Sequence, residues 1–467
     1  MLSLRRDSET PKEVSNWRLW YGVLVFGMLG AARGLDEGLT GTTASQPSFA
    51  NRFGLNDGGE SSSAGKLGNI TSMVQLGSIP GALLAFFIAD KVGRLWALRE
   101  LCFIWAVGIA IYLSASANGS IGTIYAGRFI AGLGVGQTTV VAPTYLAEIA
   151  PRYARGLCVC VFAGSAYLGI MLGYFAIWGA SLHIDNNSQM EWVVPNLLPI
   201  YFAVIIFALS FAATESPRWL AKVGKPDRAV QSLSKIRRLP EDHWYVQAEF
   251  SAISGQLHRE QEESKGLLAS FKELVTSPAN RYRIMLSVMA QLLGQWSGAN
   301  SIVVYAPQFF AILGTTGNNE KLLATAITGV VDFVAAVLCA VFIVDLLGRK
   351  RALMSGICLQ FIALLYVAIF LTVDPGVADK SNAASQTSSQ KSAGTGAIVM
   401  IYIAGIGWAL GWNSLQYLIS AEIYPLQLRA LGASIGMTVH FANQFGNSKA
   451  VSGSKGRCDW SAWLTVL

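Results

Sequence analysis

The sequence has little charge, few cysteines and few histidines for its length. Aspartate, glutamate, lysine and arginine make up 13% of its 467 residues, whereas 52% are hydrophobic. So little charge excludes the water-exposed surface of an ordinary soluble domain. The six cysteines and four histidines have neither the spacing of a disulfide framework nor that of a metal site. The sequence also lacks a phosphate-binding loop and a nucleophile–base pattern. We therefore expect no metal, no cofactor and no enzyme activity.

Long apolar runs recur from one end of the chain to the other. A helix of about twenty residues crosses the roughly 30 Å hydrocarbon layer of a membrane. The polar residues 1–16 lack the apolar core and cleavage site of a signal peptide, so we expect the start of the chain to stay in the cytoplasm. We predict about eleven spans, at residues 20–42, 69–89, 97–117, 123–148, 158–180, 195–213, 284–313, 322–344, 353–373, 396–420 and 431–447.

The basic residues lie in alternate short loops between these spans. Lys91 and Arg94 follow the second span, Arg155 follows the fourth, and Arg349 and Lys350 follow the eighth. This asymmetry obeys the positive-inside rule and places these loops in the cytoplasm. The net charge of +7 therefore reflects membrane topology and gives no continuous nucleic-acid surface. We expect a multi-pass integral protein of the plasma membrane, in contact with the lipid bilayer and with no nucleic acid.

Two charged motifs each occur twice in the chain. Asp90, Gly93 and Arg94 after the second span recur as Asp345, Gly348 and Arg349 after the eighth, and Glu148, Pro151 and Arg155 after the fourth span recur as Glu422, Pro425 and Arg429 after the tenth. Two repeats offset by the same number of spans predict an all-α membrane protein of two pseudo-symmetric six-helix bundles. Two such bundles with the substrate site between them, near the middle of the membrane, are a known transporter architecture.

The polarity of the chain suggests its division into segments. We predict a cytoplasmic N-terminus (1–16), a first bundle (17–214), a helical cytoplasmic linker (215–280), a second bundle (281–447) and an atypical tail (448–467). The residues after Asn447 are too polar for a span, and no twelfth apolar run follows them. We therefore expect an incomplete second bundle, as in a C-terminally truncated chain, with about eleven helices and the twelfth missing.

Acidic and basic residues are paired at the predicted cytoplasmic ends of the helices. A protein that opens alternately to either side needs contacts that close the cytoplasmic side in one state only, and reversible ion pairs suit this role. Alternatively, the same charges only fix the topology. The predicted pairs are Asp90 with Arg94, Glu148 with Arg155, Glu215 with Arg218, Asp345 with Arg349, and Glu422 with Arg429.

Several motifs together point to one family. They are Gly127-Arg128, Glu148-x6-Arg155-Gly156, Glu215-Ser-Pro-Arg218-Trp-Leu, Gln295-Trp-Ser-Gly298-Ala-Asn300, Asp345-Leu-Leu-Gly-Arg349-Lys and Glu422-x6-Arg429. In these motifs the sequence resembles the sugar porter family of the major facilitator superfamily, and in particular fungal carriers of sugars, polyols and quinate. The resemblance implies a major facilitator fold and secondary active transport of a sugar or sugar-like solute. A facilitative uniporter and a non-transporting sugar sensor are the alternatives.

Asp36 stands where proton-coupled members of this family look to carry an aspartate. The resemblance therefore implies symport with a proton, with Arg128 as the partner of Asp36. A carboxylate inside a membrane helix is costly unless it is paired or takes up a proton. Two other interpretations remain: Asp36 is hydrated near the outer surface, or Arg33, one helical turn before it, neutralises it.

A sugar site needs amides for the hydroxyl groups and aromatic faces for the ring. The resemblance implies that Gln295 and Asn300 bind hydroxyls and that Tyr305 lines the cavity. We also expect Trp412 and Tyr417, from a polar and aromatic cluster in the tenth span, to bind the substrate. The same residues could instead hold helices together.

Some amides of the family are absent here. Ala163, Ile170 and Gly294 occupy positions that are glutamine in a bacterial member of the family, so fewer hydroxyls find partners. Polyols, quinate-like acids and oligosaccharides therefore remain open alongside monosaccharides. Asp332 is a further charged residue within a span, placed either in the cavity or near the outer end.

Overall fold

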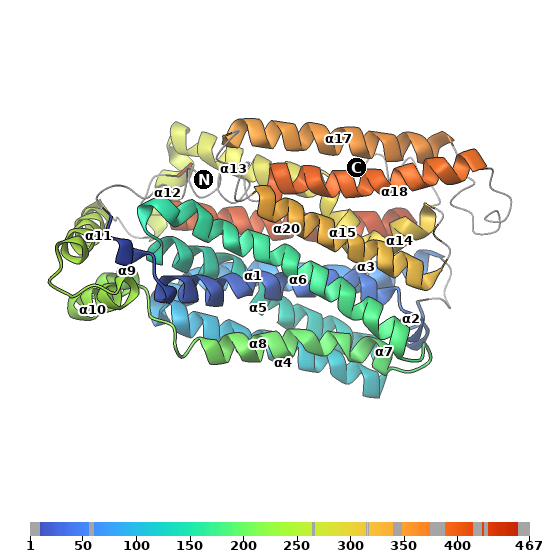
Figure 1. Ribbon diagram of the computed structural model, residues 1–467, viewed down its shortest axis with the longest axis horizontal. Coiled ribbons are helices and arrows are strands. Elements are labelled where there is room, and N and C mark those ends of the chain that lie inside the picture. The colour runs from blue at the N-terminus through green and yellow to red at the C-terminus, as the bar shows by residue number, and fades with distance from the viewer. Residues whose placement is uncertain are drawn as a thin grey trace.

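The fold is a set of long, nearly parallel helices. The computed structural model describes residues 10–55, 60–263, 267–313, 315, 317–339, 348–373, 388–413, 423–424 and 428–455. These residues form helices and connecting turns and no strand. Figure 1 shows the earlier helices, in blue to green, lying below the later ones, in yellow to red.

The earlier helices form the first bundle. They are α1 (Trp17–Ala44), α2 (Pro47–Arg52), α3 (Glu60–Val92), α4 (Arg94–Asn118), α5 (Ile121–Ile149), α6 (Arg155–His183), α7 (Met190–Val193), η3 (Pro195–Leu197) and α8 (Leu198–Leu209). The polar residues of α1 and α5 are largely buried among other helices, Asp36 and Arg128 among them. Apolar residues of α4 and α8 such as Phe103 and Tyr201 are exposed instead, as expected of helices that face lipid.

The later helices form the second bundle. They are α13 (Pro278–Trp296), α14 (Ala299–Ile312), α15 (Asn318–Leu338), α17 (Arg349–Val373), α18 (Ser388–Trp408), the π-helical turn η7 (Ala409–Asn413) and α20 (Arg429–Lys455). The predicted span 284–313 is two helices here, because the chain bends at Gly298. Gly298 has a φ of +85°, which a residue without Cβ adopts at little cost. The ends of the predicted spans 322–344 and 396–420 lie outside the described residues.

Helix α20 continues past the predicted end of its span at residue 447 and ends at Lys455. Its polar residues have partners on other helices. The Asn447 side-chain amide donates to the Gln295 carbonyl oxygen at 2.5 Å, and the Ser448 carbonyl oxygen accepts from the Tyr305 hydroxyl at 3.1 Å. Lys449 donates to the Asn69 side-chain oxygen. The polar residues after 447 therefore lie on a helix face that contacts the protein. Because we took their polarity as the end of the span, the predicted boundary at residue 447 was wrong.

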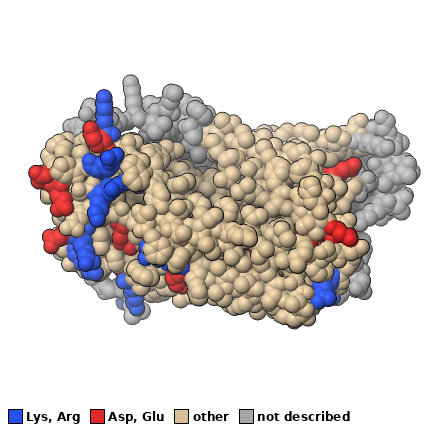
Figure 2. Space-filling view, turned by 60° about the horizontal axis from the view of Figure 1, so that its bottom comes forward, with Lys and Arg blue, Asp and Glu red and all other residues tan. Residues whose placement is uncertain are grey.

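The surface divides into a charged end and an uncharged middle. Figure 2 shows lysine, arginine, aspartate and glutamate gathered mainly at one end of this face, while its middle is uncharged. Seven of the described helices are long and apolar enough to cross a membrane. Helices α1, α5, α13, α14 and α20 are not among these seven. Helix α14 has 14 residues and is too short, and α1, α5, α13 and α20 carry buried polar residues that lower their hydropathy. An uncharged belt around a polar interior is what a bilayer requires.

The linker folds into short helices at the charged end of the molecule (Figure 1). They are α9 (Pro217–Lys222), α10 (Pro226–Arg237), α11 (Trp244–Glu263) and α12 (Leu267–Thr276). Val14 from η1 (Lys12–Val14) packs with Leu233 and Val246 in a small apolar core. The fully buried Arg237 pairs with Glu249 at 2.7 Å and donates to the Ile149 carbonyl oxygen at 2.9 Å. This contact fastens the linker to the end of α5.

Glycines allow the helices of the first bundle to approach closely. A Cβ atom added to Gly77 of α3 would overlap the Phe129 carbonyl oxygen of α5, and one added to Gly132 of α5 would overlap the Val74 carbonyl oxygen of α3. Helices in a membrane associate through such small residues because lipid offers no hydrophobic drive between them. The α3–α5 crossing therefore depends on glycine at both positions.

We predict that Gly132→Ala lowers the free energy of unfolding by about 1–3 kcal/mol, because the backbones of α3 and α5 must separate. The check is the thermal unfolding midpoint of the purified protein in detergent. Gly164→Ala in α6 is the matched control, because a Cβ there meets nothing within 4 Å, and it should leave the midpoint unchanged or slightly raised. Equal midpoints for the two variants would contradict the close-packing argument.

Candidate functional site

A buried ion pair joins α1 to α5 inside the first bundle. Asp36 Oδ1 lies 3.5 Å from Arg128 Nη1, and the two residues are 2% and 1% exposed. Arg128 also donates to the Thr40 hydroxyl and lies 5.3 Å from the centre of the Tyr112 ring. Arg128 therefore keeps polar and aromatic partners whichever charge Asp36 carries. The structure brings together the two residues that the sequence singled out for proton coupling.

A second group of buried polar residues lies one turn away on α1. Arg33 pairs with Glu37 at 3.0 Å, and its Nη2 lies 3.4 Å from His440 Nε2 on α20. The Gln444 amide of α20 donates to Glu37 Oε1 at 3.3 Å. These contacts cross from the first bundle to the second.

The imidazole of His440 extends this group to α13. Its Nδ1 lies 2.9 Å from Gln291 Oε1 and 3.1 Å from Gln295 Nε2. Because a guanidinium only donates, Nε2 accepts from Arg33 and Nδ1 carries the hydrogen that goes to Gln291. The Gln295 amide nitrogen, which also only donates, is then directed to Nε2 at 3.5 Å. We call Arg33, Glu37, Gln291, Gln295, His440 and Gln444 the central polar cluster. It places charge and amides together between the two bundles.

The structure disperses the other predicted substrate residues. Asn300 lies in the first turn of α14, and Trp412 is buried in η7. Tyr305 is fully buried, with its hydroxyl 2.9 Å from the Thr71 hydroxyl of α3. Tyr417 lies outside the described residues. Of the predicted substrate residues, Gln295 is the one within the central polar cluster.

The bundles also meet near the ends predicted to lie outside the cell. Tyr305 links Thr71 of α3 with the Ser448 carbonyl of α20. Gly41 of α1 lies against the Val304 backbone so closely that a Cβ there would overlap its carbonyl oxygen. Along their length, α3 packs on α20 and α6 packs on α15. The central polar cluster is thus covered on this side by contacts between bundles.

The charged residues at the end of the first bundle that is predicted to be cytoplasmic form one network. Arg94 binds Glu148 through two hydrogen bonds of 2.7 and 2.9 Å and lies 3.1 Å from Asp90. Glu215 accepts from the backbone amides of Arg94 and Leu95 at 3.1 and 3.2 Å. It therefore caps the start of α4, where free amides and the helix dipole favour a carboxylate. Burial nevertheless raises the pKa of Glu215, against the opposing effect of these hydrogen bonds.

The remaining predicted gate residues are placed as follows. Arg155 begins α6 and Arg218 lies in α9, both at the end of the molecule where this network lies. Arg349 and Arg429 are the first residues of α17 and α20. Asp345 and Glu422 lie outside the described residues. The network that the structure describes is therefore internal to the first bundle and the linker.

Sequence reasoning missed several members of these groups. Lys222 pairs with Asp90 at 2.8 Å, and no motif pointed to it. The central polar cluster had a signal, because Glu37 follows Arg33, Gln295 follows Gln291 and Gln444 follows His440, each by four residues. Residues four apart share one helix face, so three helices each carry a polar pair on one face.

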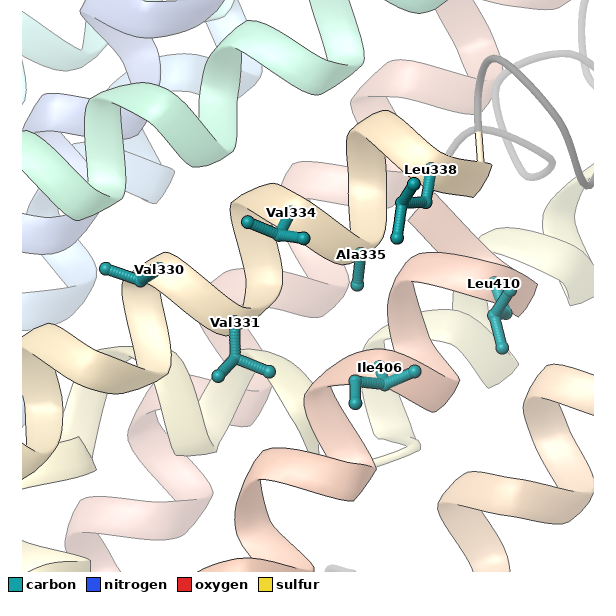
Figure 3. Close-up of a pocket in the computed structure, with 7 residues that line it drawn as sticks. All are labelled: Val330, Val331, Val334, Ala335, Leu338, Ile406 and Leu410. Atoms are coloured by element: carbon teal, nitrogen blue, oxygen red, sulfur yellow. The ribbon is translucent and has the colours of Figure 1, made fainter.

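A cavity of about 340 Å³ lies elsewhere, between α15 and α18. Figure 3 shows aliphatic side chains along it, and its lining is Val330, Val331, Val334, Ala335, Leu338, Ile406 and Leu410. Val334 and Leu338 are about half exposed, so the cavity is a groove on the apolar surface. It offers a sugar no hydrogen-bonding group, and we do not assign the substrate to it.

Solved structures share this arrangement of helices. Xylose transporter XylE from E. coli, in a partially occluded inward-open conformation, matches with a TM-score of 0.74 and 18% identity, covering 96% of this chain and 97% of that one. The proton:xylose symporter XylE bound to 6-bromo-6-deoxy-D-glucose matches with a TM-score of 0.76 and 21% identity over 96% of each chain. This chain thus has the fold of these structures, and the predicted class, an all-α membrane protein with this fold, is confirmed.

Sequence comparison gives the family. A family model described as "Sugar (and other) transporter" matches residues 22–450, and this chain belongs to that family. A probable quinate permease of Neosartorya fischeri is 28% identical over 99% of this chain and 84% of its own length. A quinate permease of Neurospora africana is 31% identical over 92% of this chain and 80% of its own length. The relatives are permeases and not enzymes, and the resemblance drawn from the motifs is confirmed.

We predict that Glu148→Gln lowers the free energy of unfolding by about 3 kcal/mol or more, because it leaves Arg94 buried without its bidentate partner. Asp90→Asn is the matched control on the same arginine. The Asp90 side chain is about one-third exposed, so its loss should cost less than about 1 kcal/mol. Thermal unfolding in detergent compares the two variants, and equal losses would show that the Arg94–Glu148 contact does not anchor the network.

Proposed function

We propose that this chain carries a sugar-like solute across the plasma membrane together with a proton, by alternating access. The observation that carries the proposal is the buried pair of Asp36 and Arg128. The proposed solute is a sugar, a polyol or a quinate-like acid. The solute binds between the two bundles at the central polar cluster, and the proton binds at Asp36.

The geometry around Asp36 supports a reversible proton site. A pair that is 1–2% exposed holds two opposite charges out of water, and each depends on the other for compensation. When Asp36 takes up a proton, the attraction between it and Arg128 is lost. Arg128 retains the Thr40 hydroxyl and the Tyr112 ring. Protonation thus changes the contact between α1 and α5 without leaving a bare charge, which shifts the balance between two arrangements of the helices.

The relatives support the class of solute and the coupling. The fungal relatives named above are described as quinate permeases, and one of the similar structures is described as a proton:xylose symporter. Xylose and quinate both present several hydroxyls on a ring, and buried amides such as Gln291 and Gln295 bind such groups. Division of the chain into two bundles (17–214 and 281–447) joined by a cytoplasmic linker (215–280) suits rocking about this site.

The ion pairs at the cytoplasmic end belong to the same proposal. Arg94 with Asp90 and Glu148 ties α3, α4 and α5 into one rigid unit. We propose that this unit, with Arg155 and Glu215–Arg218, moves as a body when the cytoplasmic side opens. Asp345–Arg349 and Glu422–Arg429 take the corresponding role in the second bundle.

We predict that Asp36→Asn abolishes solute-driven proton uptake, because asparagine cannot bind and release a proton. Uptake of labelled solute down its concentration gradient should be preserved. The check is alkalinisation of a weakly buffered medium when solute is added to cells that produce the protein, run beside uptake of labelled xylose and labelled quinate.

The matched control is Asp185→Asn, the same substitution at an exposed residue, which should keep alkalinisation at the level of the unmodified protein. Uptake without alkalinisation by the unmodified protein would replace symport by uniport. Undiminished alkalinisation by Asp36→Asn would remove Asp36 from the proton path.

A further inference from the structure

We infer that Arg33 binds the carboxylate of the transported solute, so that the preferred substrates are hydroxylated ring acids in their anionic form. The inference rests on the proposed function and names its substrate class. Arg33 lies near the middle of α1 (Trp17–Ala44) and is 7% exposed. A guanidinium at this depth is costly, and a neutral sugar offers nothing that requires it.

The surroundings of Arg33 suit an anion that also carries hydroxyls. Its Nη2 lies 3.4 Å from His440, and its guanidinium lies 5.6 Å from the centre of the Phe441 ring. Through His440 it is connected to the amides of Gln291 and Gln295. A planar guanidinium pairs with a carboxylate through two parallel hydrogen bonds, and amides bind hydroxyls as donors and acceptors. The cluster thus holds partners for both parts of a hydroxylated acid.

One buried acceptor in the cluster points to a ligand. Gln295 is 2% exposed, and its Oε1 has no hydrogen-bond partner among the described residues. A buried acceptor of this kind costs free energy unless something donates to it. A ring hydroxyl is such a donor. Gln295 lies beside His440, which contacts Arg33, so one solute can reach both Gln295 and Arg33.

Glu37 holds Arg33 ready in the absence of an anion. It neutralises the guanidinium at 3.0 Å, and its own Oε1 also accepts from the Gln444 amide at 3.3 Å. An incoming carboxylate therefore displaces one ion-pair partner of Arg33, while Glu37 keeps a hydrogen bond from Gln444. The exchange keeps Arg33 compensated throughout, whereas Glu37 loses its cation and retains the neutral Gln444 amide, so the charge of Glu37 opposes the exchange. It also predicts that Glu37 competes with the substrate.

The test measures binding to the purified protein in detergent, as the concentration of each probe that raises the unfolding temperature half-maximally. The probes are quinate, its uncharged methyl ester and xylose. The unmodified protein should bind quinate about tenfold or more tightly than the ester, since hydrogen bonds to a charged group are the stronger ones. Arg33→Gln should lose this preference, and Arg33→Lys should keep part of it. Glu37→Gln, which removes the competitor, should bind quinate more tightly.

Arg52→Gln, at an exposed arginine of the short helix α2, is the control and should behave as the unmodified protein. Equal affinity for quinate and its ester, or an unchanged preference in Arg33→Gln, would overturn the inference. Loss of quinate binding in Glu37→Gln would also overturn it, because the pair would then be structural.

Two outcomes separate this inference from the proposed function. Xylose binding and uptake without quinate binding would overturn the inference and leave sugar transport standing. Failure of the unmodified protein to move xylose or quinate into vesicles would overturn the proposed function, whatever Arg33 does.

Discussion

A charge buried within a bundle of apolar helices must have a partner, and this requirement governs the middle of the molecule. Asp36 and Arg128 compensate each other at 3.5 Å, and Arg33 and Glu37 do so at 3.0 Å. The first pair ties α1 to α5, and the contacts of the second pair with His440 and Gln444 tie α1 to α20. A proton or an anion that enters either pair changes what holds α1 in place, which is how a small ligand can act on a whole helix.

The rest of the structure supports this central helix. Glycine crossings bring α3 and α5 close together, and the Arg94 network ties the ends of α3 and α5 near Asp90 and Glu148 to α4. The linker is fastened to α5 through the buried Arg237. These contacts surround the ion pairs of α1, which itself packs against α14 of the second bundle.

The all-α type of the fold followed from hydropathy, and the motifs led to the family. Hydropathy failed at α20, where Asn447, Ser448 and Lys449 have partners on other helices that a linear pattern does not show. The pairing of Asp36 with Arg128 was predictable because the resemblance to the family implied it, and both are charged residues within apolar spans. The contact between Arg33 and His440 was not, because it joins residues from different bundles, and only the four-residue spacing within each helix pointed to a shared polar face.

The central claim, transport of a sugar-like solute driven by a proton, is tested most directly in sealed vesicles that contain only the purified protein. Labelled quinate or xylose is supplied outside, with and without an imposed pH gradient that is alkaline inside. The account predicts accumulation above the external concentration when the gradient is present, and equilibration alone when it is collapsed. Uptake to the same level under both conditions would contradict it.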